Sequence, residues 1–312
     1  MKIKKLISIF LSVSVFACMF AGCSNKNNGK FNVVCSLFPQ YDFVREIAGN
    51  KVNLRLMLVG GVDAHDFEPL SEEMSIAKSA DLFIYTGDYM ELWVAKRMKD
   101  AKKTQDYIFD ASTGITLDID MASQEIAGQT GNGENAPLFD PHFWTNPLNA
   151  IKMVDTITTR LCLMDTVNAD FYKANATAYK LKLEALDKGF KDTVQNGKRK
   201  NIVIGDSFAL SYFTKAYGLG YLATQNTCFP VTEPSESVLA RLENAIIKGN
   251  VPVIFYRDNS DQKTAKLLSE KTGAQMLLFH SCENLSKEEL KAGATYLSLM
   301  QQNLKNLKTA LG

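Results

Sequence analysis

The sequence predicts an α/β fold in which two similar lobes, each with a mostly parallel four-stranded sheet, are joined by one long rigid helix. Short β-rich runs alternate with helical stretches in both halves of the chain, an order typical of parallel sheets covered by helices. One long amphipathic stretch separates the halves. The chain has 312 residues, 46% hydrophobic and 22% charged, so its length and composition suit about two globular domains.

The first residues have the pattern of an export signal. Lysines near the start precede an apolar run over residues 6–21, and Cys23 follows two small residues. The run is short for a transmembrane helix, the alternative interpretation, which needs about 20 residues. The ending Phe20–Cys23 resembles the lipobox of bacterial lipoproteins, although its first position is more usually Leu. The resemblance implies a signal peptide at 1–22 and a lipid anchor on Cys23, at the extracytoplasmic face of the cell membrane.

The remaining chain divides into a tether, two lobes and a linking helix. A polar tether at 23–30 precedes an N-terminal lobe at 31–166, the linking helix at 167–198 and a C-terminal lobe at 199–312. In the N-terminal lobe we expect strands at 31–37, 52–59, 81–85 and 107–109, and helices at 41–47, 71–79 and 91–99. Residues 118–138 are polar and rich in Gly and Asn, which predicts an exposed loop.

The linking helix is indicated by apolar residues that recur every three or four positions. This apolar face consists of Tyr172, Ala176, Tyr179, Leu183, Leu186 and Phe190. The helix is expected from about 168 to 195, before Gly197. In the C-terminal lobe we expect strands at 201–204, 220–223, 251–256 and 275–279, and helices at 207–217, 236–248, 261–272 and 287–310. Ser286 and Glu289 have the spacing of a capping box for the last helix.

All three histidines of the chain lie in segments that are expected to be loops. His65 comes shortly after the second strand, His280 directly follows the last one, and His142 precedes a helix. Ligands of open α/β sheets bind outside the carboxyl ends of strands, so the three side chains can converge in one cleft. A lone loop histidine is more often solvated or capping, but three imidazoles with one carboxylate or thiolate would suit tetrahedral zinc.

Several motifs resemble the metal-binding substrate-binding proteins of zinc and manganese ABC importers, over essentially all of residues 31–312. They are LFPQYDFVREIAG at 37–49, GVDAHDFEP at 61–69, SADLFIYTG at 79–87, DPHFWTNP at 140–147, AYGL at 216–219 and EPS at 233–235. The resemblance implies two α/β lobes linked by one long helix, with the metal between them. It also implies that His65 and His142 are metal ligands, and that the partners are an ABC permease and its ATPase.

The C-terminal lobe departs from the family pattern at both of its ligand positions. Gly205 stands where the family usually has His or Glu, and Asp206 is adjacent to it. The family's last ligand, an Asp after the final strand, is absent, and His280 stands one residue away. The predicted metal ligands are therefore His65, His142 and His280, with Asp206 as the fourth.

Carboxylates near the first two ligands are candidates to orient the imidazoles, since a ligating histidine usually donates its other N–H to a carboxylate or carbonyl. These candidates are Asp63, Asp66, Glu68 and Asp140, for which loop solvation or helix capping is the alternative. Cys228 and Cys282 each follow a predicted strand of the C-terminal lobe. They are candidates for a disulfide, for inert thiols or for zinc ligation.

Zinc is favoured over manganese because a third histidine and a nearby cysteine suit the softer metal. Many zinc members of the family carry histidines in the loop before the second ligand motif, whereas residues 118–138 contain none. The formal charge is +1, and loss of the signal lysines leaves 32 basic against 34 acidic residues, so nothing indicates a nucleic-acid partner.

An enzyme is not expected, because the sequence has no HExxH, GxSxG or P-loop motif. The predicted function is capture of zinc between the lobes by a monomer and its delivery to the permease. The alternative is the same scaffold with a degraded metal site, acting as an adhesin or as a binder of another solute.

Overall fold

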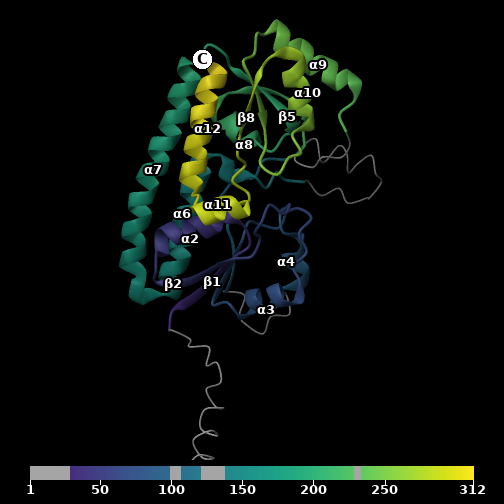
Figure 1. Ribbon diagram of the computed structural model, residues 1–312. Helices are drawn as coiled ribbons and strands as arrows, with labels where there is room; N and C mark the ends of the chain where they lie inside the picture. Colours follow the sequence, from purple (N-terminus) through teal and green to yellow (C-terminus); the bar gives the residue numbers. More distant parts are fainter. Residues whose placement is uncertain (1–28, 99–106, 121–137, 228–232) are drawn as a thin grey trace, which may run out of the picture. The chain divides into compact units, whose positions relative to one another are not determined.

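A computed structural model describes residues 29–98, 107–120, 138–227 and 233–312 (Figure 1). Residues Phe31–Gly312 form one compact unit. The predicted signal peptide and Cys23 lie outside the described residues, as does most of the predicted loop at 118–138. Among the helices that the structure describes, none combines the length and the hydropathy required to span a bilayer.

The N-terminal lobe contains a four-stranded parallel sheet in the order β2-β1-β3-β4. Its strands are β1 (Phe31–Cys35), β2 (Val52–Leu56), β3 (Leu82–Tyr85) and β4 (Ile108–Asp110). The helices described here are α2 (Phe38–Ala48), α3 (Ser71–Ser79) and α4 (Leu92–Arg97). The side chains of β3 are all buried, as expected for an inner strand covered on both faces.

The C-terminal lobe repeats this arrangement in the order β6-β5-β7-β8, again with parallel pairs. Its strands are β5 (Asn201–Ser207), β6 (Gly220–Gln225), β7 (Val253–Tyr256) and β8 (Gln275–Leu278). Its helices are α8 (Ser211–Tyr217), α9 (Glu236–Lys248), α10 (Lys263–Thr272), α11 (Lys287–Ala292) and α12 (Tyr296–Leu311). The shared strand order confirms the prediction of two similar α/β lobes.

The long helix α7 (Ala169–Asn196) links the two sheets in the chain and runs along one side of the unit (Figure 1). It follows α6 (Pro147–Met164) and packs against α6, against α2 of the N-terminal lobe and against α12 of the C-terminal lobe. All six residues of the predicted apolar face are buried. One continuous helix thus contacts elements of both lobes.

The chain after β8 differs from the single helix expected at 287–310. Gly293 adopts a left-handed conformation with φ 72°, which ends α11, and Thr295 then caps the start of α12. The predicted capping box is confirmed, since Ser286 and Glu289 each accept from the backbone N–H of the other. The helix expected from residue 207 begins at Ser211, because β5 continues to Ser207.

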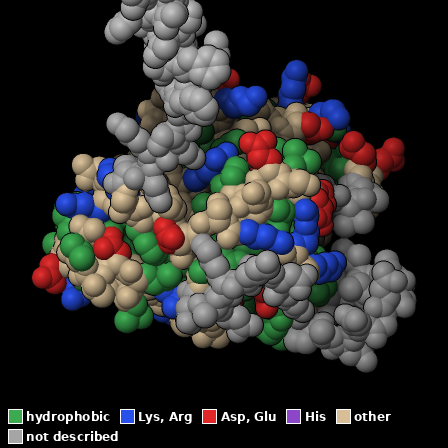
Figure 2. Space-filling view, turned by 90° about the horizontal axis from the view of Figure 1, so that it is seen from below, with side chains coloured by type: hydrophobic (Ala, Val, Ile, Leu, Met, Phe, Trp, Pro, Cys, Tyr) green, Lys and Arg blue, Asp and Glu red, His purple; other side chains and the backbone are tan. Residues whose placement is uncertain are grey.

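The described surface carries both signs of charge. In the face shown in Figure 2, basic and acidic side chains are interspersed among apolar ones rather than gathered into a field of one sign. This distribution agrees with the near-zero formal charge of the sequence and offers no extended basic surface in that view.

Candidate metal centre

His65 lies in the loop that leaves β2 and crosses toward the C-terminal lobe. Two glycines with positive φ, Gly60 at 83° and Gly61 at 75°, allow the sharp turns of this loop. The Asp63 carboxylate accepts a hydrogen bond from the backbone N–H of His65 at 2.9 Å. The backbone N–H of Ala64 donates to Glu283 Oε1 at 3.2 Å, which attaches the loop to the C-terminal lobe.

His142 precedes the short 3₁₀ helix η2 (Phe143–Thr145), and its side chain is fully buried. Asp140 Oδ1 lies 2.8 Å from His142 Nδ1 and also accepts from the His142 backbone N–H at 2.9 Å. The Trp144 ring packs against the imidazole, with centroids 5.4 Å apart. Because Asp140 engages Nδ1, the other ring nitrogen is directed at His65, and the two Nε2 atoms are 3.3 Å apart.

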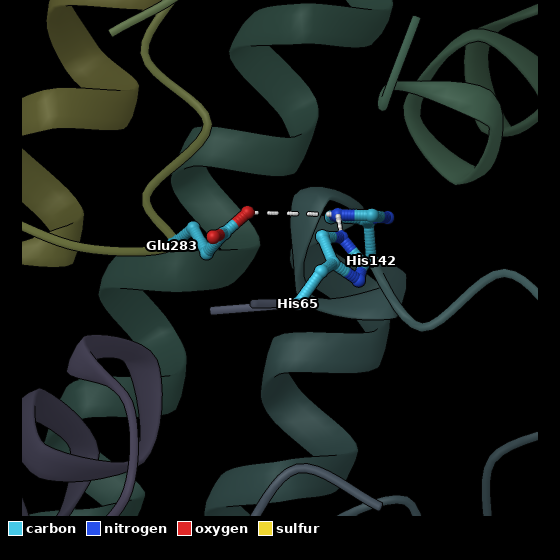
Figure 3. A group of neighbouring side chains, drawn as sticks. All are labelled: His65, His142 and Glu283. Atoms are coloured by element: carbon cyan, nitrogen blue, oxygen red, sulfur yellow. Dashed lines mark hydrogen bonds and ion pairs between the residues drawn. The ribbon is translucent and has the colours of Figure 1, made fainter. Parts of the chain in front are cut away.

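Glu283 completes a cluster of three side chains (Figure 3). It lies in the loop after β8, and its Oε2 is 3.6 Å from His142 Nε2. One ligand atom from each of His65, His142 and Glu283 lies within 4.8 Å of the others. Two imidazole nitrogens and a carboxylate oxygen are a donor set that zinc accepts, so the residues fit a divalent transition metal. The three side chains come from both lobes.

The three side chains shift one another's pKa values. Burial disfavours the charged form of His142, but hydrogen bonds and attraction from Asp140 and Glu283 outweigh it and raise the pKa of His142 to about 9. Burial and the neighbouring His142 lower the pKa of His65 to about 4. Burial opposes ionisation of Glu283, yet His142 brings its pKa to about 2. A proton on His142 thus balances the carboxylates, and a metal ion must displace that proton.

His280 does not lie in this cluster. Its side chain is buried, its Nδ1 accepts from the Cys282 backbone N–H at 2.9 Å, and its Nε2 faces Glu289 Oε1 at 3.3 Å. Asn303 of α12 contacts both the backbone N–H and the carbonyl of His280, at 2.8 Å each. Both ring nitrogens therefore face partners within the C-terminal lobe.

The sequence analysis did not predict Glu283 as a member of the metal centre. The available signal was its position, because its carboxylate lies in the loop that follows the last strand.

Asp206 lines a polar cavity of about 370 Å³ beside Glu283 but is not one of the three clustered residues. Its neighbour Gly205 has no room for a side chain, because an added Cβ would lie 2.7 Å from Ala265 Cα of α10. A side chain at position 205 would therefore meet α10 before it could reach into the cavity.

The four carboxylates expected to orient the imidazoles have different roles. Asp140 contacts the ring of His142, whereas Asp63 contacts the backbone of His65. The side chains of Asp66 and Glu68 are exposed, and Glu68 lies 3.5 Å from Arg97. The Asp140 side chain also accepts from Ser211, and its carbonyl accepts from the Tyr212 hydroxyl at 2.9 Å, so α8 holds the same loop.

Cys282 is a free thiol in the described part of the chain, and the disulfide with Cys228 stays a prediction because its partner is not described. Cys282 is fully buried among core side chains that include Tyr296, and burial raises the pKa of its thiol. The thiol is therefore held in the core rather than at the cleft. Cys228 lies outside the described residues.

Comparisons with known proteins identify one family. The chain matches the family described as ZnuA, zinc-uptake complex component A, periplasmic, over residues 33–310. It is 33% identical to the zinc-binding lipoprotein AdcA of Streptococcus pneumoniae over 97% of this chain, and spans 60% of that relative's length. It is 31% identical to the high-affinity zinc uptake system protein ZnuA of Bacillus subtilis, covering 99% of this chain and 98% of the relative.

A solved structure shows the same fold. The Zn(II)-bound ZnuA-like domain of Streptococcus pneumoniae AdcA superposes with a TM-score of 0.75 at 31% identity, covering 91% of this chain and 99% of that domain. The matched family consists of metal-uptake binding proteins and is not a class of enzymes. From the two-lobe fold, the histidine–glutamate cluster between the lobes and the match over residues 33–310, this chain belongs to the ZnuA family of zinc-uptake binding proteins.

Proposed function

We propose that this protein captures zinc between its lobes, on the extracytoplasmic face of the membrane, and delivers it to an ABC permease driven by an ATPase. The observation that carries the proposal is the convergence of His65, His142 and Glu283 from the two lobes. A metal bound by all three would tie the lobes together, so capture and release would be linked to small movements of the loops that carry them.

The proposed protein ligands are His65 Nε2, His142 Nε2 and a carboxylate oxygen of Glu283. Two imidazoles and one carboxylate favour zinc over manganese, which prefers a larger share of oxygen ligands. His280 is proposed to fix the loop after β8 through Glu289 and Asn303 rather than to bind the ion. Asp206 lines the adjacent cavity, and the zinc affinity of an Asp206→Asn variant tests whether it is a further ligand.

Attachment to the membrane is proposed through lipid on Cys23, followed by the polar tether at 23–30. Two observations support it: the lipobox-like ending of the signal segment, and the description of the AdcA relative as a lipoprotein. Metabolic labelling with a radioactive fatty acid tests the anchor. Label should enter the wild type and be lost in Cys23→Ala, and equal labelling of both proteins would contradict the proposal.

The test of zinc capture is metal analysis of the purified protein, combined with competition against a chromophoric chelator. We expect one zinc per chain. His65→Ala, His142→Ala and Glu283→Gln should each weaken zinc binding by about 100-fold or more, because each removes one ligand of a four-coordinate ion. Asp66→Asn is the matched control, since this carboxylate is exposed in the same loop as His65.

The outcomes separate the parts of the proposal. Loss of zinc in His280→Ala with retention in Glu283→Gln would overturn the ligand assignment. Tighter binding of manganese than of zinc would overturn the choice of metal, and binding of neither would overturn the function itself. Delivery is tested with the permease and ATPase in proteoliposomes, where the zinc-loaded protein should stimulate ATP hydrolysis and the Glu283→Gln protein should not.

A further inference from the structure

The cavity beside the metal centre has the size of a small-molecule site. Its volume is about 370 Å³, which falls within the range of sites that hold organic ligands and greatly exceeds the space that one ion or water fills. Glu283 and Asp63 line it on the side of the metal centre, and the rest of the lining comes mainly from the ends of β5, β6 and β7, the loop after β7 and the start of α10. A molecule in this cavity would therefore be adjacent to a metal held by Glu283.

The ligand set of the described residues leaves room for such a molecule. Zinc in proteins is usually four-coordinate, whereas the clustered residues supply three ligand atoms. Gly205 faces α10, and Asp206 lies outside the cluster at the cavity wall. The fourth ligand atom can therefore come from a molecule bound in the cavity.

The charges around the cavity select a class of molecule. Arg257 is the single cationic side chain among the lining residues, and its charge acts on both His65 and Glu283. A guanidinium near a dication is unfavourable unless an anionic group lies between them. The remaining charged residues of the lining are carboxylates, namely Asp63, Asp206, Glu233, Asp258, Asp261 and Glu283. A purely anionic chelator would be repelled by these, and a purely cationic one by Arg257 and the metal.

Two buried polar atoms of the lining residues add a second observation. Asp206 Oδ2 and the Nε of Arg257 are inaccessible to solvent and have no hydrogen-bond partner among the described residues. Buried polar groups without partners are costly. Because both atoms are sealed from solvent, the two side chains would turn toward a ligand in the cavity to gain its donors and acceptors. The two atoms carry opposite charges, as do the two ends of a zwitterion.

We propose that this cavity binds a small zwitterionic chelator, a free amino acid such as histidine, which supplies the fourth ligand to the zinc. The inference rests on the proposed zinc capture by His65, His142 and Glu283. The α-carboxylate of the amino acid pairs with Arg257, its donors face the carboxylates that include Asp206, and its remaining nitrogen binds the metal. The protein then captures zinc together with its chelator.

The experiment titrates L-histidine into the protein already loaded with one zinc, by calorimetry, with native mass spectrometry to weigh the complex. One histidine should bind per zinc-loaded chain, and the X-ray absorption of zinc should gain the signature of one more imidazole. Arg257→Gln should weaken histidine binding by about tenfold or more, because the carboxylate loses its charged partner. Arg55→Gln, which removes an exposed arginine of β2, is the matched control.

A second variant guards against a folding defect in the first. Thr264→Phe places a ring into the cavity from a partly exposed position of α10, and it should also weaken histidine binding. The inference is overturned if histidine only strips zinc from the protein, or if it binds equally to wild type and Arg257→Gln. It is also overturned if Asp206→Asn abolishes zinc binding in the absence of any amino acid, since Asp206 would then be the fourth ligand. Binding of no zinc, with or without histidine, would instead contradict the proposed function.

Discussion

At the scale of single residues, Asp140 orients the His142 ring so that its Nε2 can bind a metal. It accepts from Nδ1 of the ring, and α8 holds it from the other lobe through Ser211 and Tyr212. With Nδ1 occupied, the lone pair of Nε2 is the one available to a metal. The carboxylate also stabilises the positive charge that the ligated imidazole acquires.

We expect Asp140→Asn to weaken zinc binding by about 10- to 100-fold, the usual effect of removing the carboxylate behind a ligating histidine. An amide offers both a donor and an acceptor, so it no longer fixes which ring nitrogen is protonated. Competition with a chromophoric chelator measures the change. Unchanged zinc affinity would show that the backbone alone orients the ring.

Glu91 is a fully buried carboxylate that is not one of the three clustered residues. It accepts hydrogen bonds from the backbone N–H groups of Thr86 and Gly87 and from the Ser36 hydroxyl. Burial is the largest influence on it, and despite these hydrogen bonds the pKa of Glu91 rises to about 7. Its folded-state pKa is thus above the value of an unfolded glutamate.

The consequence is a loss of stability as pH rises. Between about pH 4.5 and 7 the folded state holds a proton on Glu91 that the unfolded state has released, so the free energy of unfolding falls with increasing pH. Urea denaturation at several pH values should show a shallower fall in Glu91→Gln than in wild type. Parallel curves for the two proteins would contradict a raised pKa.

At the scale of elements, the close contact of β5 with α10 determines what position 205 can hold. A Cβ on Gly205 would meet the backbone of Ala265, and backbone atoms of a packed helix have little freedom to move. Gly189 of α7 gives a useful contrast, because its added Cβ would meet the end of the Leu304 side chain at 2.7 Å, which can change rotamer.

We expect Gly205→Ala to lower the free energy of unfolding by about 1–3 kcal/mol, the usual cost of overpacking a well-packed core. Gly189→Ala should cost less, since a side chain yields more easily and Ala favours the helix. Urea denaturation of both variants measures the difference. Equal or greater loss in Gly189→Ala would mean that α10 shifts freely on β5.

At the scale of the whole molecule, hydrogen bonds near the metal centre connect distant segments. The Trp144 indole N–H donates to the Ser281 carbonyl at 2.9 Å, and the Tyr296 hydroxyl donates to the Trp144 carbonyl at 2.6 Å. The Tyr296 backbone N–H donates to Asp42 of α2 at 2.7 Å. Together with α7, these contacts hold the loops of the two lobes in position around the metal centre.

Zinc should therefore stabilise the whole unit, because its proposed ligands come from both lobes. A ligand that binds only the folded state adds about 2.7 kcal/mol at a concentration 100 times its dissociation constant. We expect the melting temperature to rise with zinc concentration in wild type and the rise to be much smaller in Glu283→Gln. An equal rise in both proteins would place the zinc elsewhere.

The secondary structure could largely be predicted because it depends on local patterns. The apolar face of α7 follows the helical period over many turns, and the β-rich runs match the observed strands closely. Two exceptions were the helix expected at 287–310, which Gly293 divides, and the helix expected from residue 207, which begins at Ser211. An isolated glycine is compatible with a helix interior, but here Gly293 takes a left-handed conformation and Thr295 caps a new helix.

The sequence by itself determined the two-lobe α/β fold, and the loops that carry His65, His142 and the residues after the last strand. Only the tertiary structure decided which side chain of that last loop meets the histidines. Cys282, between them, takes a positive φ of 59°, and the His280 ring faces Glu289 while Glu283 reaches Ala64 and His142. The direction of a loop side chain depends on single backbone torsions and on partners distant in the chain, and residue spacing records neither.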